Sequence, residues 1–153
     1  MPHFTAVAVL LTAATPPTTP PAAAATPPAP PAHPSHAVVR PADVVGPPLP
    51  VERFPAPVKN ACGIWKGLDW PTVAKARDFP VARSALVIRG GSIHRNLSGH
   101  LPASGHYREY DVTPRPPGRH RDAERLVRDP GTHAVWYTGD HYRTFRKIAS
   151  GCP

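Results

Sequence analysis

Four side chains in the second half of this chain have the types that metal-free cleavage of RNA requires: Glu109, Arg121, Arg125 and His141. In that reaction a carboxylate takes the 2′-hydroxyl proton, arginines stabilise charge on the pentavalent phosphate, and an imidazolium protonates the leaving 5′-oxygen. The four residues are therefore candidates for a catalytic set. Spacing alone also allows a plainer interpretation, in which Glu109 forms a solvated ion pair and His141 is a turn residue.

The elements that must position these side chains are predicted to be β-strands and turns. Residues 106–112 alternate with a period of two, so Glu109 and Asp111 share one face of a strand. Arg121 and Arg125 would lie about 13 Å apart on one extended strand, and closer if the chain bends between them. The histidine belongs to a tight Thr-Gly-Asp-His turn between aromatic residues, which predicts a hairpin.

The remaining pattern predicts one helix before an antiparallel sheet. Further strands are expected at residues 84–89, 124–128, 134–138 and 142–148, with a turn at the Gly pair 90–91. A short helix is expected at residues 69–78, with Pro71 in its first turn and residues 79–80 ending it. The predicted fold class is α+β, one short N-terminal helix packed on an antiparallel β-sheet whose other face is free for a ligand.

Composition divides the chain at residue 57. Residues 1–57 hold sixteen of the 24 Pro and carry no net charge, so they predict a disordered Pro/Ala-rich segment without a packed core. The whole formal charge of +8 then belongs to residues 58–153, the predicted domain. Arg outnumbers Lys by 14 to 4, and Arg fits phosphate bidentately, although a GC-rich genome would give the same bias. The charge predicts a polyanionic partner.

The N-terminus carries an apolar run at residues 4–14 that is typical of a signal peptide and too short to span a bilayer. We therefore expect export without a membrane anchor, with a signal peptide in residues 1–25 and a linker in residues 26–57. Small residues suited to cleavage occur at 12–14 and at 23–25, and both positions stay open.

The two cysteines, Cys62 and Cys152, frame the predicted domain. Two thiols alone cannot form a structural zinc site, and in an exported chain they should pair. Such a disulfide closes a loop of about 90 residues, which the chain-entropy model values at roughly 4 to 5 kcal/mol. Two free buried thiols remain the alternative if the chain is not exported.

Three sequence strings in order resemble the guanyl-specific microbial ribonucleases, the bacterial branch that includes barnase and the secreted streptomycete enzymes. They are Tyr-Arg-Glu-Tyr at 107–110, Arg-Asp-Ala-Glu-Arg-Leu-Val at 121–127 and Tyr-Thr-Gly-Asp-His-Tyr-Arg-Thr-Phe at 137–145. The resemblance runs from Cys62 to Cys152 and implies the microbial ribonuclease fold. It implies Glu109 as general base, His141 as general acid, Arg121 and Arg125 as phosphate ligands, and Tyr142 beside the phosphate.

The same resemblance implies the partners. It predicts single-stranded RNA as substrate, a protein inhibitor of the barstar type, a disulfide between the two cysteines as in the streptomycete members, and no cofactor or metal. We further expect a monomer that does not bind membranes.

The expected base-recognition loop departs from the family pattern. Relatives resemble Phe-x-Asn-Arg-Glu-x-x-Leu-Pro, whereas residues 94–102 here read His-Arg-Asn-Leu-Ser-Gly-His-Leu-Pro. Asn96 matches, but Leu97 replaces Arg, and Ser98 replaces the Glu that would accept hydrogen bonds from guanine. The predicted substrate-binding residues are Arg95, Asn96, Leu97, Ser98 and Tyr142, with relaxed guanine preference.

Other histidines and the tryptophans offer weaker signals. His94, His100 and His106 recur every six residues, an interval that would spread ligands too far along a strand to bind one metal. The three Trp suit either base stacking or the core.

The sequence thus predicts a secreted, metal-independent endoribonuclease that forms a 2′,3′-cyclic phosphate. Two alternatives stay open, a catalytically idle module that binds RNA or another polyanion, and a ribonuclease toxin domain.

Overall fold

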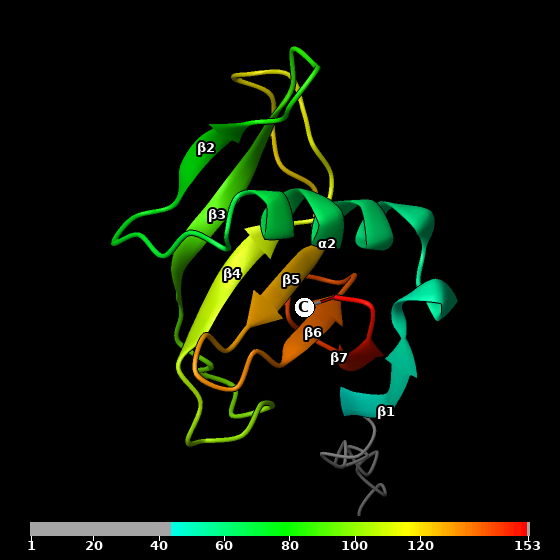
Figure 1. Cartoon of the computed structure of the whole chain (residues 1–153). Coiled ribbons are helices and arrows are strands. Elements are labelled where there is room, and N and C mark those ends of the chain that lie inside the picture. Colours follow the sequence, from blue (N-terminus) through cyan, green and yellow to red (C-terminus); the bar gives the residue numbers. More distant parts are fainter. Residues whose placement is uncertain (1–43, 153) are drawn as a thin grey trace, which may run out of the picture. The chain divides into compact units, whose positions relative to one another are not determined.

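The structure is a computed structural model that describes residues 44–152, in which one helix packs on a seven-stranded sheet (Figure 1). The elements in order are β1 (Val45–Pro50), the 3-10 helix η1 (Val51–Arg53), α2 (Ala56–Gly67), β2 (Arg77–Pro80), β3 (Val87–His94), β4 (Tyr107–Asp111), β5 (Arg125–Arg128), β6 (Val135–Thr138) and β7 (Phe145–Ser150). The strand order is β1-β7-β6-β5-β4-β3-β2. The α+β class is confirmed, whereas the predicted signal peptide and most of the linker lie outside the described residues.

The sheet is antiparallel except at one edge. Strand β1 pairs with β7 in parallel, and every other neighbouring pair is antiparallel. Its register with β7 shifts between Gly46 and Leu49, where Pro47 and Pro48 lack the N–H groups that a regular ladder needs. An edge strand tolerates such prolines.

The domain therefore begins before residue 58. Strand β1 and η1 lie in residues that were expected to be linker, and Val51 is buried in the core. The expectation that no core residue precedes residue 58 is wrong for residues 44–57. The high Pro content predicts no regular structure for this segment. The prolines lie at a sheet edge and at the entrance to a helix, however, and both positions tolerate proline.

Helix α2 forms where a stripe of apolar side chains recurs at helical spacing. Val58, Ala61, Cys62 and Trp65 are its buried residues, and a proline occupies its first turn. The predicted helix at residues 69–78 is wrong. Asp69 and Trp70 adopt left-handed backbone conformations (φ 57° and 42°) that end α2, and residues 77–80 form β2.

The strand predictions are confirmed in the centre of the sheet and displaced at its sides. Strands β4, β5 and β6 match the expected segments closely, whereas β3 starts at Val87 and continues to His94. The expected turn at the Gly pair lies inside β3. Gly90 lets the β4 backbone approach, because a Cβ there would lie 2.9 Å from the Cα of Tyr110, and Gly91 (φ 90°) lies at a bulge.

The sheet has a covered face and a second, smaller apolar face. Under α2, the Trp65 ring lies 4.9 Å from the ring of Tyr110, in the main core. On the other face a separate cluster contains Leu101, Tyr107, Val127, Trp136 and Phe145. All three tryptophans are buried, so the core interpretation of them is confirmed.

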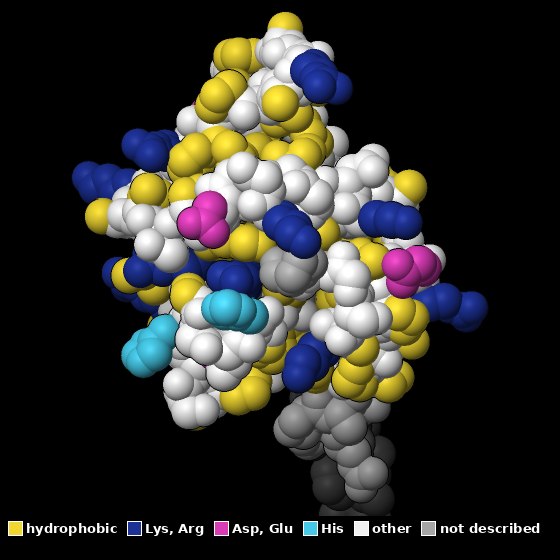
Figure 2. Space-filling model, in the orientation of Figure 1, with side chains coloured by type: hydrophobic (Ala, Val, Ile, Leu, Met, Phe, Trp, Pro, Cys, Tyr) yellow, Lys and Arg dark blue, Asp and Glu magenta, His cyan; other side chains and the backbone are white. Residues whose placement is uncertain are grey.

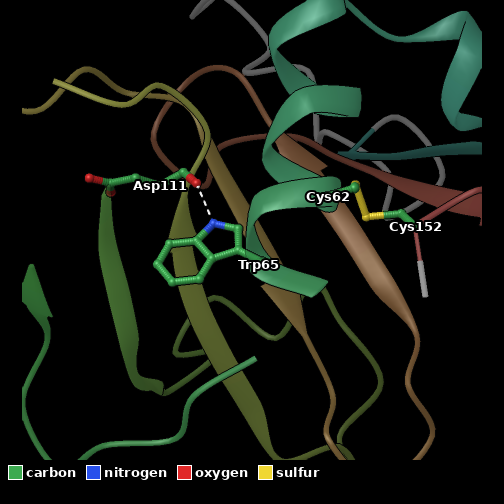
Figure 3. The surroundings of a disulfide bond; sticks show 4 residues. All are labelled: Cys62, Trp65, Asp111 and Cys152. Atoms are coloured by element: carbon green, nitrogen blue, oxygen red, sulfur yellow. Dashed lines mark hydrogen bonds between the residues drawn. A yellow bond between two sulfur atoms is a disulfide. The ribbon is translucent and has the colours of Figure 1, made fainter. Parts of the chain in front are cut away.

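A disulfide ties α2 to the end of the chain. Cys62 and Cys152 are bonded, with their Cα atoms 5.1 Å apart (Figure 3). One helical turn further along, Trp65 Nε1 donates a hydrogen bond to the backbone oxygen of Asp111 at 2.8 Å. Within residues 44–152, no helix has the length and apolar character needed to cross a membrane.

Candidate active site

Glu109 projects from the middle of β4 on the face opposite α2. Its cross-strand partner in β3 is Ser92, whose Oγ donates to Glu109 Oε1 at 3.1 Å. Its other carboxylate oxygen, Oε2, accepts a hydrogen bond from the hydroxyl of Tyr142. Because both bonds end on a carboxylate on a rigid strand, Glu109 is held in one orientation and is half-buried.

Asp111 lies two residues further along the same face and brings the two candidate arginines together. Arg121 Nε donates to Asp111 Oδ1 at 2.8 Å, and Arg125 Nε lies 3.4 Å from the same oxygen in an ion pair. The side chains of Asp111 and Arg125 are each only 3% exposed. The sequence pattern alone indicates no function for Asp111. Its placement on the Glu109 face by alternation was the available signal.

The chain bends between the two arginines. Arg121 precedes β5 in a loop, whereas Arg125 is the first residue of β5. Arg125 also donates to Asp122 Oδ1 at 3.2 Å and to the Glu124 backbone oxygen at 2.6 Å. Burial alone would lower the pKa of Arg121, but the hydrogen bond from its guanidinium to Asp111 raises that pKa above its ordinary value, so Arg121 stays charged.

His141 lies in a turn that Asp140 holds together. The Asp140 carboxylate accepts hydrogen bonds from the hydroxyls of Thr138 (3.0 Å) and Thr144 (2.6 Å) and from the backbone N–H groups of Arg143 (3.1 Å) and Thr144 (2.9 Å). Burial would raise the pKa of Asp140, but these hydrogen bonds lower it below its ordinary value.

The turn places His141 in an uncommon backbone conformation. His141 and the following Tyr142 both have positive φ angles, 60° and 72°. Such angles persist in non-glycine residues only where surrounding contacts impose them, and they are frequent at active sites. Here the His141 N–H donates to the Ala123 oxygen at 3.3 Å, and the Tyr142 N–H donates to Thr138 Oγ1 at 3.0 Å.

Tyr142 connects the candidate acid to the candidate base. Its ring centroid lies 5.1 Å from the His141 imidazole, while its hydroxyl bonds to Glu109. Burial and the neighbouring Glu109 carboxylate both raise the pKa of Tyr142, so its hydroxyl remains a donor. The structure thus brings Glu109, His141 and Tyr142 together with the arginine pair.

The predicted recognition loop forms one wall of a cavity beside Glu109. The cavity has a volume of about 400 Å³ and is lined by residues 93–98 together with Glu109 and Tyr142. All the predicted substrate-binding residues therefore lie around one hollow next to the candidate base. His94, which was considered only as a metal ligand, also lines it.

Asn96 braces this loop through its side chain. Its amide nitrogen donates to the Leu101 oxygen at 2.8 Å, and its amide oxygen accepts from the Leu101 N–H at 3.1 Å. Asn96 has φ 48°, a conformation that Asn tolerates better than most residues. Its role is to fix the loop backbone.

The two positions at which Leu97 and Ser98 replace the Arg and Glu of the family pattern face solvent. Leu97 is 89% exposed, and Arg95 and Ser98 are exposed as well. Glu109 is the one carboxylate among the cavity-lining residues, and it is already engaged by Ser92 and Tyr142. Among residues 44–152, no group of three His, Cys, Asp or Glu side chains is placed to hold a metal ion.

Comparison with known proteins gives two kinds of match. A family model described as ribonuclease matches residues 55–149. Guanyl-specific ribonuclease Sa of Kitasatospora aureofaciens is 38% identical over 64 residues, which cover 40% of this chain and 66% of that protein. Guanyl-specific ribonuclease Sa3 of the same organism is 38% identical over 65 residues, covering 40% of this chain and 45% of the relative. The matched part is therefore less than two thirds of either relative.

Proposed function

Because this chain belongs to the microbial guanyl-specific ribonuclease family, we propose that it is a secreted endoribonuclease that cleaves single-stranded RNA without a metal. The observation that carries the proposal is the linkage through Tyr142. Its hydroxyl holds the Glu109 carboxylate and its ring contacts His141, so a base and an acid stand on two sides of one residue. Two charged arginines lie beside them on Asp111.

The reaction follows from the chemistry of these groups. Glu109 takes the proton of the 2′-hydroxyl, and the 2′-oxygen forms a bond to phosphorus. The bond from phosphorus to the 5′-oxygen breaks, and His141 gives that oxygen its proton, which leaves a 2′,3′-cyclic phosphate. Arg121 and Arg125 stabilise the negative charge on the phosphate oxygens in between. If the cyclic phosphate is then hydrolysed, the acid and the base exchange roles.

The charge of the molecule supports an RNA substrate. The sequence has a formal net charge of +8. On the face that α2 covers, shown in Figure 2, Lys and Arg side chains are spread with few acidic ones between them. A polyanion is attracted to such a surface at a rate that depends on salt.

Secretion and partners are further parts of the proposal. The disulfide supports an oxidising compartment, in agreement with the apolar run at the N-terminus. An enzyme of this kind is dangerous to the cell that makes it, so we include an intracellular inhibitor of the barstar type. We propose that the enzyme itself acts as a monomer.

The test is cleavage of a mixed single-stranded RNA in the presence of EDTA. We expect products with 2′,3′-cyclic phosphate ends, and a loss of kcat/KM on the order of 100-fold or more in Glu109→Gln and in His141→Ala. Glu52→Gln is the matched control, because Glu52 is exposed in η1, apart from the site.

Two results would contradict the proposal. Full activity in either site variant would remove that residue from the mechanism. RNA binding without cleavage by the wild type would favour the idle binding module, an alternative that the altered recognition loop supports.

A further inference from the structure

His94 is the last residue of β3 and lies on the same face of the sheet as Glu109. The register pairs Ser92 with Glu109 and His94 with Tyr107, so His94 and Glu109 are diagonal neighbours across two strands. The family pattern that residues 94–102 resemble has Phe at this position, and the proposed mechanism assigns His94 no role.

The imidazole of His94 lies among aromatic rings. Its centroid is 4.8 Å from that of Tyr142, 6.0 Å from that of Phe145 and 6.5 Å from that of Tyr107. Tyr142 therefore has an imidazole from β3 and the imidazole of His141 both against its ring. This three-ring stack connects the recognition loop to the candidate acid and, through the Tyr142 hydroxyl, to Glu109.

The surroundings of His94 favour its uncharged form. Its Nε2 atom is buried and has no hydrogen-bond partner among the described residues. A charged ring carries an N–H on both nitrogens, so it would bury an unsatisfied donor there. Burial accordingly lowers the pKa of His94, although the Glu109 carboxylate opposes that shift.

We propose that His94 is a positioning residue of the cleavage reaction, whose uncharged imidazole supports the Tyr142 ring so that the Tyr142 hydroxyl stays on Glu109. This inference rests on the proposed function. When His94 gains a proton, its ring can no longer stay in the apolar stack without an unsatisfied N–H. Tyr142 then loses its support, and activity falls.

The charged groups around the three rings provide no free acidic partner that would stabilise a charged His94. The titratable and charged groups around the stack come from several elements. They are Tyr107 and Glu109 from β4, His141 and Tyr142 from the hairpin, His100 beside Phe145, Arg95, His106 and Arg108 around the pockets that His94 lines, and Arg121 and Arg125 near the Tyr142 hydroxyl. Glu109 is the one acid in this set. Glu109 must stay ionised and bonded to Tyr142 for catalysis. If it formed an ion pair with a charged His94 instead, activity would be lost.

The proposal predicts that two protonation events, at Glu109 and at His94, both lower kcat/KM on the acid side of the pH profile. Activity requires an ionised Glu109 and also an uncharged His94, so kcat/KM should fall more steeply than for one group. The additional loss should begin below pH 6.5, because the pKa of His94 is lowered from that value.

The test compares the wild type with His94→Phe, which keeps an aromatic ring but cannot be charged. Each profile of kcat/KM against pH is divided by its own value at pH 8, so a uniform change in activity cancels. The ratio of the variant to the wild type should rise as the pH falls, approaching about tenfold for each unit below the point where His94 titrates. His133→Asn is the control, because His133 is exposed in the turn between β5 and β6, outside the cavity beside Glu109, and Asn tolerates its φ of 60°; its profile should follow the wild type.

The outcomes separate this inference from the proposed function. If the wild type cleaves RNA at pH 8 and the His94→Phe profile runs parallel to it, the inference is overturned while the proposed function stands. No cleavage at pH 8 would contradict the proposed function itself.

A second measurement covers the case in which His94→Phe does not fold. The His94 ring protons, followed by NMR in the wild type, should titrate below pH 6.5, and at a still lower pH in Glu109→Gln, because Glu109 raises the pKa of His94. Titration at or above pH 6.5, or no response to Glu109→Gln, would overturn the inference.

Discussion

At the scale of single residues, base selectivity depends on positions 97 and 98. A carboxylate can accept from both N1–H and N2–H of guanine, and Ser98 cannot offer that paired geometry. Asn96 is no substitute for that carboxylate, since its neutral side-chain amide has a single oxygen, which already accepts from the Leu101 N–H. What remains are backbone N–H groups of the loop, which can meet the O6 of guanine but leave its N1–H and N2–H unread.

We therefore expect weak guanine preference in the wild type and a gain in the double variant Leu97→Arg/Ser98→Glu. A good bidentate base contact is worth about 1 to 3 kcal/mol, or roughly 5- to 150-fold in selectivity. The measurement is kcat/KM for GpU, ApU and UpU. Leu97→Arg alone is the control, because it adds the charge without the carboxylate. Strict cleavage after guanine by the wild type, with no gain from Glu, would show that another part of the loop reads the base.

At the scale of elements, the hairpin turn from Thr138 to Thr144 depends on one ionised side chain. Hydrogen bonds hold the pKa of Asp140 below its ordinary value of 3.8. A carboxyl group with a lowered pKa in the folded state stabilises the fold above its unfolded pKa, and that contribution is lost as the pH falls through the folded pKa.

Asp140→Asn should therefore lower the melting temperature at pH 5 to 7, and the difference from the wild type should shrink below pH 3.8. Because His141 and Tyr142 have strained backbones, loosening the turn should also lower kcat/KM, on the order of 100-fold for a displacement of about 1 Å. Thermal melting against pH is the measurement. Asp69→Asn is the control, since Asp69 is exposed and outside the hairpin. A difference that stays constant down to pH 2 would contradict the role of the ionised carboxylate.

The elements that can be predicted from the sequence are those whose signals lie within the segment itself. Strands β4 to β6 could be predicted from local signals. The segment of β4 alternates with a period of two, whereas β5 and β6 are short segments bounded by turn residues, and all four residues of β5 are buried. The position of α2 does not follow from composition, since Pro57 continues the Pro-rich segment, whereas a proline in the first helical turn is favourable. Asp69 and Trp70 resemble a helix start in sequence, but their left-handed conformations (φ 57° and 42°) end α2 instead.

The same limit applies to the candidate site. Glu109 and His141 could be found by residue type and by resemblance to a family. Asp111 could not be assigned, because its function depends on two arginines that only a bend in the chain brings to the same oxygen. His94 was likewise visible in sequence only as one of three evenly spaced histidines, since the ring stack joins it to residues almost fifty positions away.

At the scale of the whole molecule, the two faces of the sheet meet at Asp111. Its carboxylate holds the arginines on the open face, while its backbone oxygen accepts the Trp65 hydrogen bond from α2 (Figure 3). The disulfide holds the same helix one turn away, at Cys62. Helix α2 thus contributes to stability through the disulfide at Cys62 and to the geometry of the site through the hydrogen bond from Trp65.

Those separate contacts lead to a prediction for the disulfide. Reduction frees a loop that spans most of the domain, so we expect the free energy of unfolding to fall by about 2 to 5 kcal/mol. The Trp65 ring is fully buried, and its contacts with Tyr110 and with the Asp111 backbone oxygen do not involve either cysteine. We therefore expect kcat/KM of the reduced but folded enzyme to stay close to that of the oxidised enzyme.

Urea unfolding measures the first quantity, and cleavage at 25 °C the second, in the wild type and in the double variant Cys62→Ala/Cys152→Ala. Intact mass should show that oxidation removes two hydrogens from the wild type. Trp65→Phe gives the opposite pattern: it keeps the disulfide and most of the packing but removes the hydrogen bond to Asp111, so it should lower kcat/KM more than the cysteine variant does. If the cysteine variant loses activity while still folded, then the disulfide itself holds α2 against β4, and Trp65 alone does not keep Asp111 in position for the two arginines.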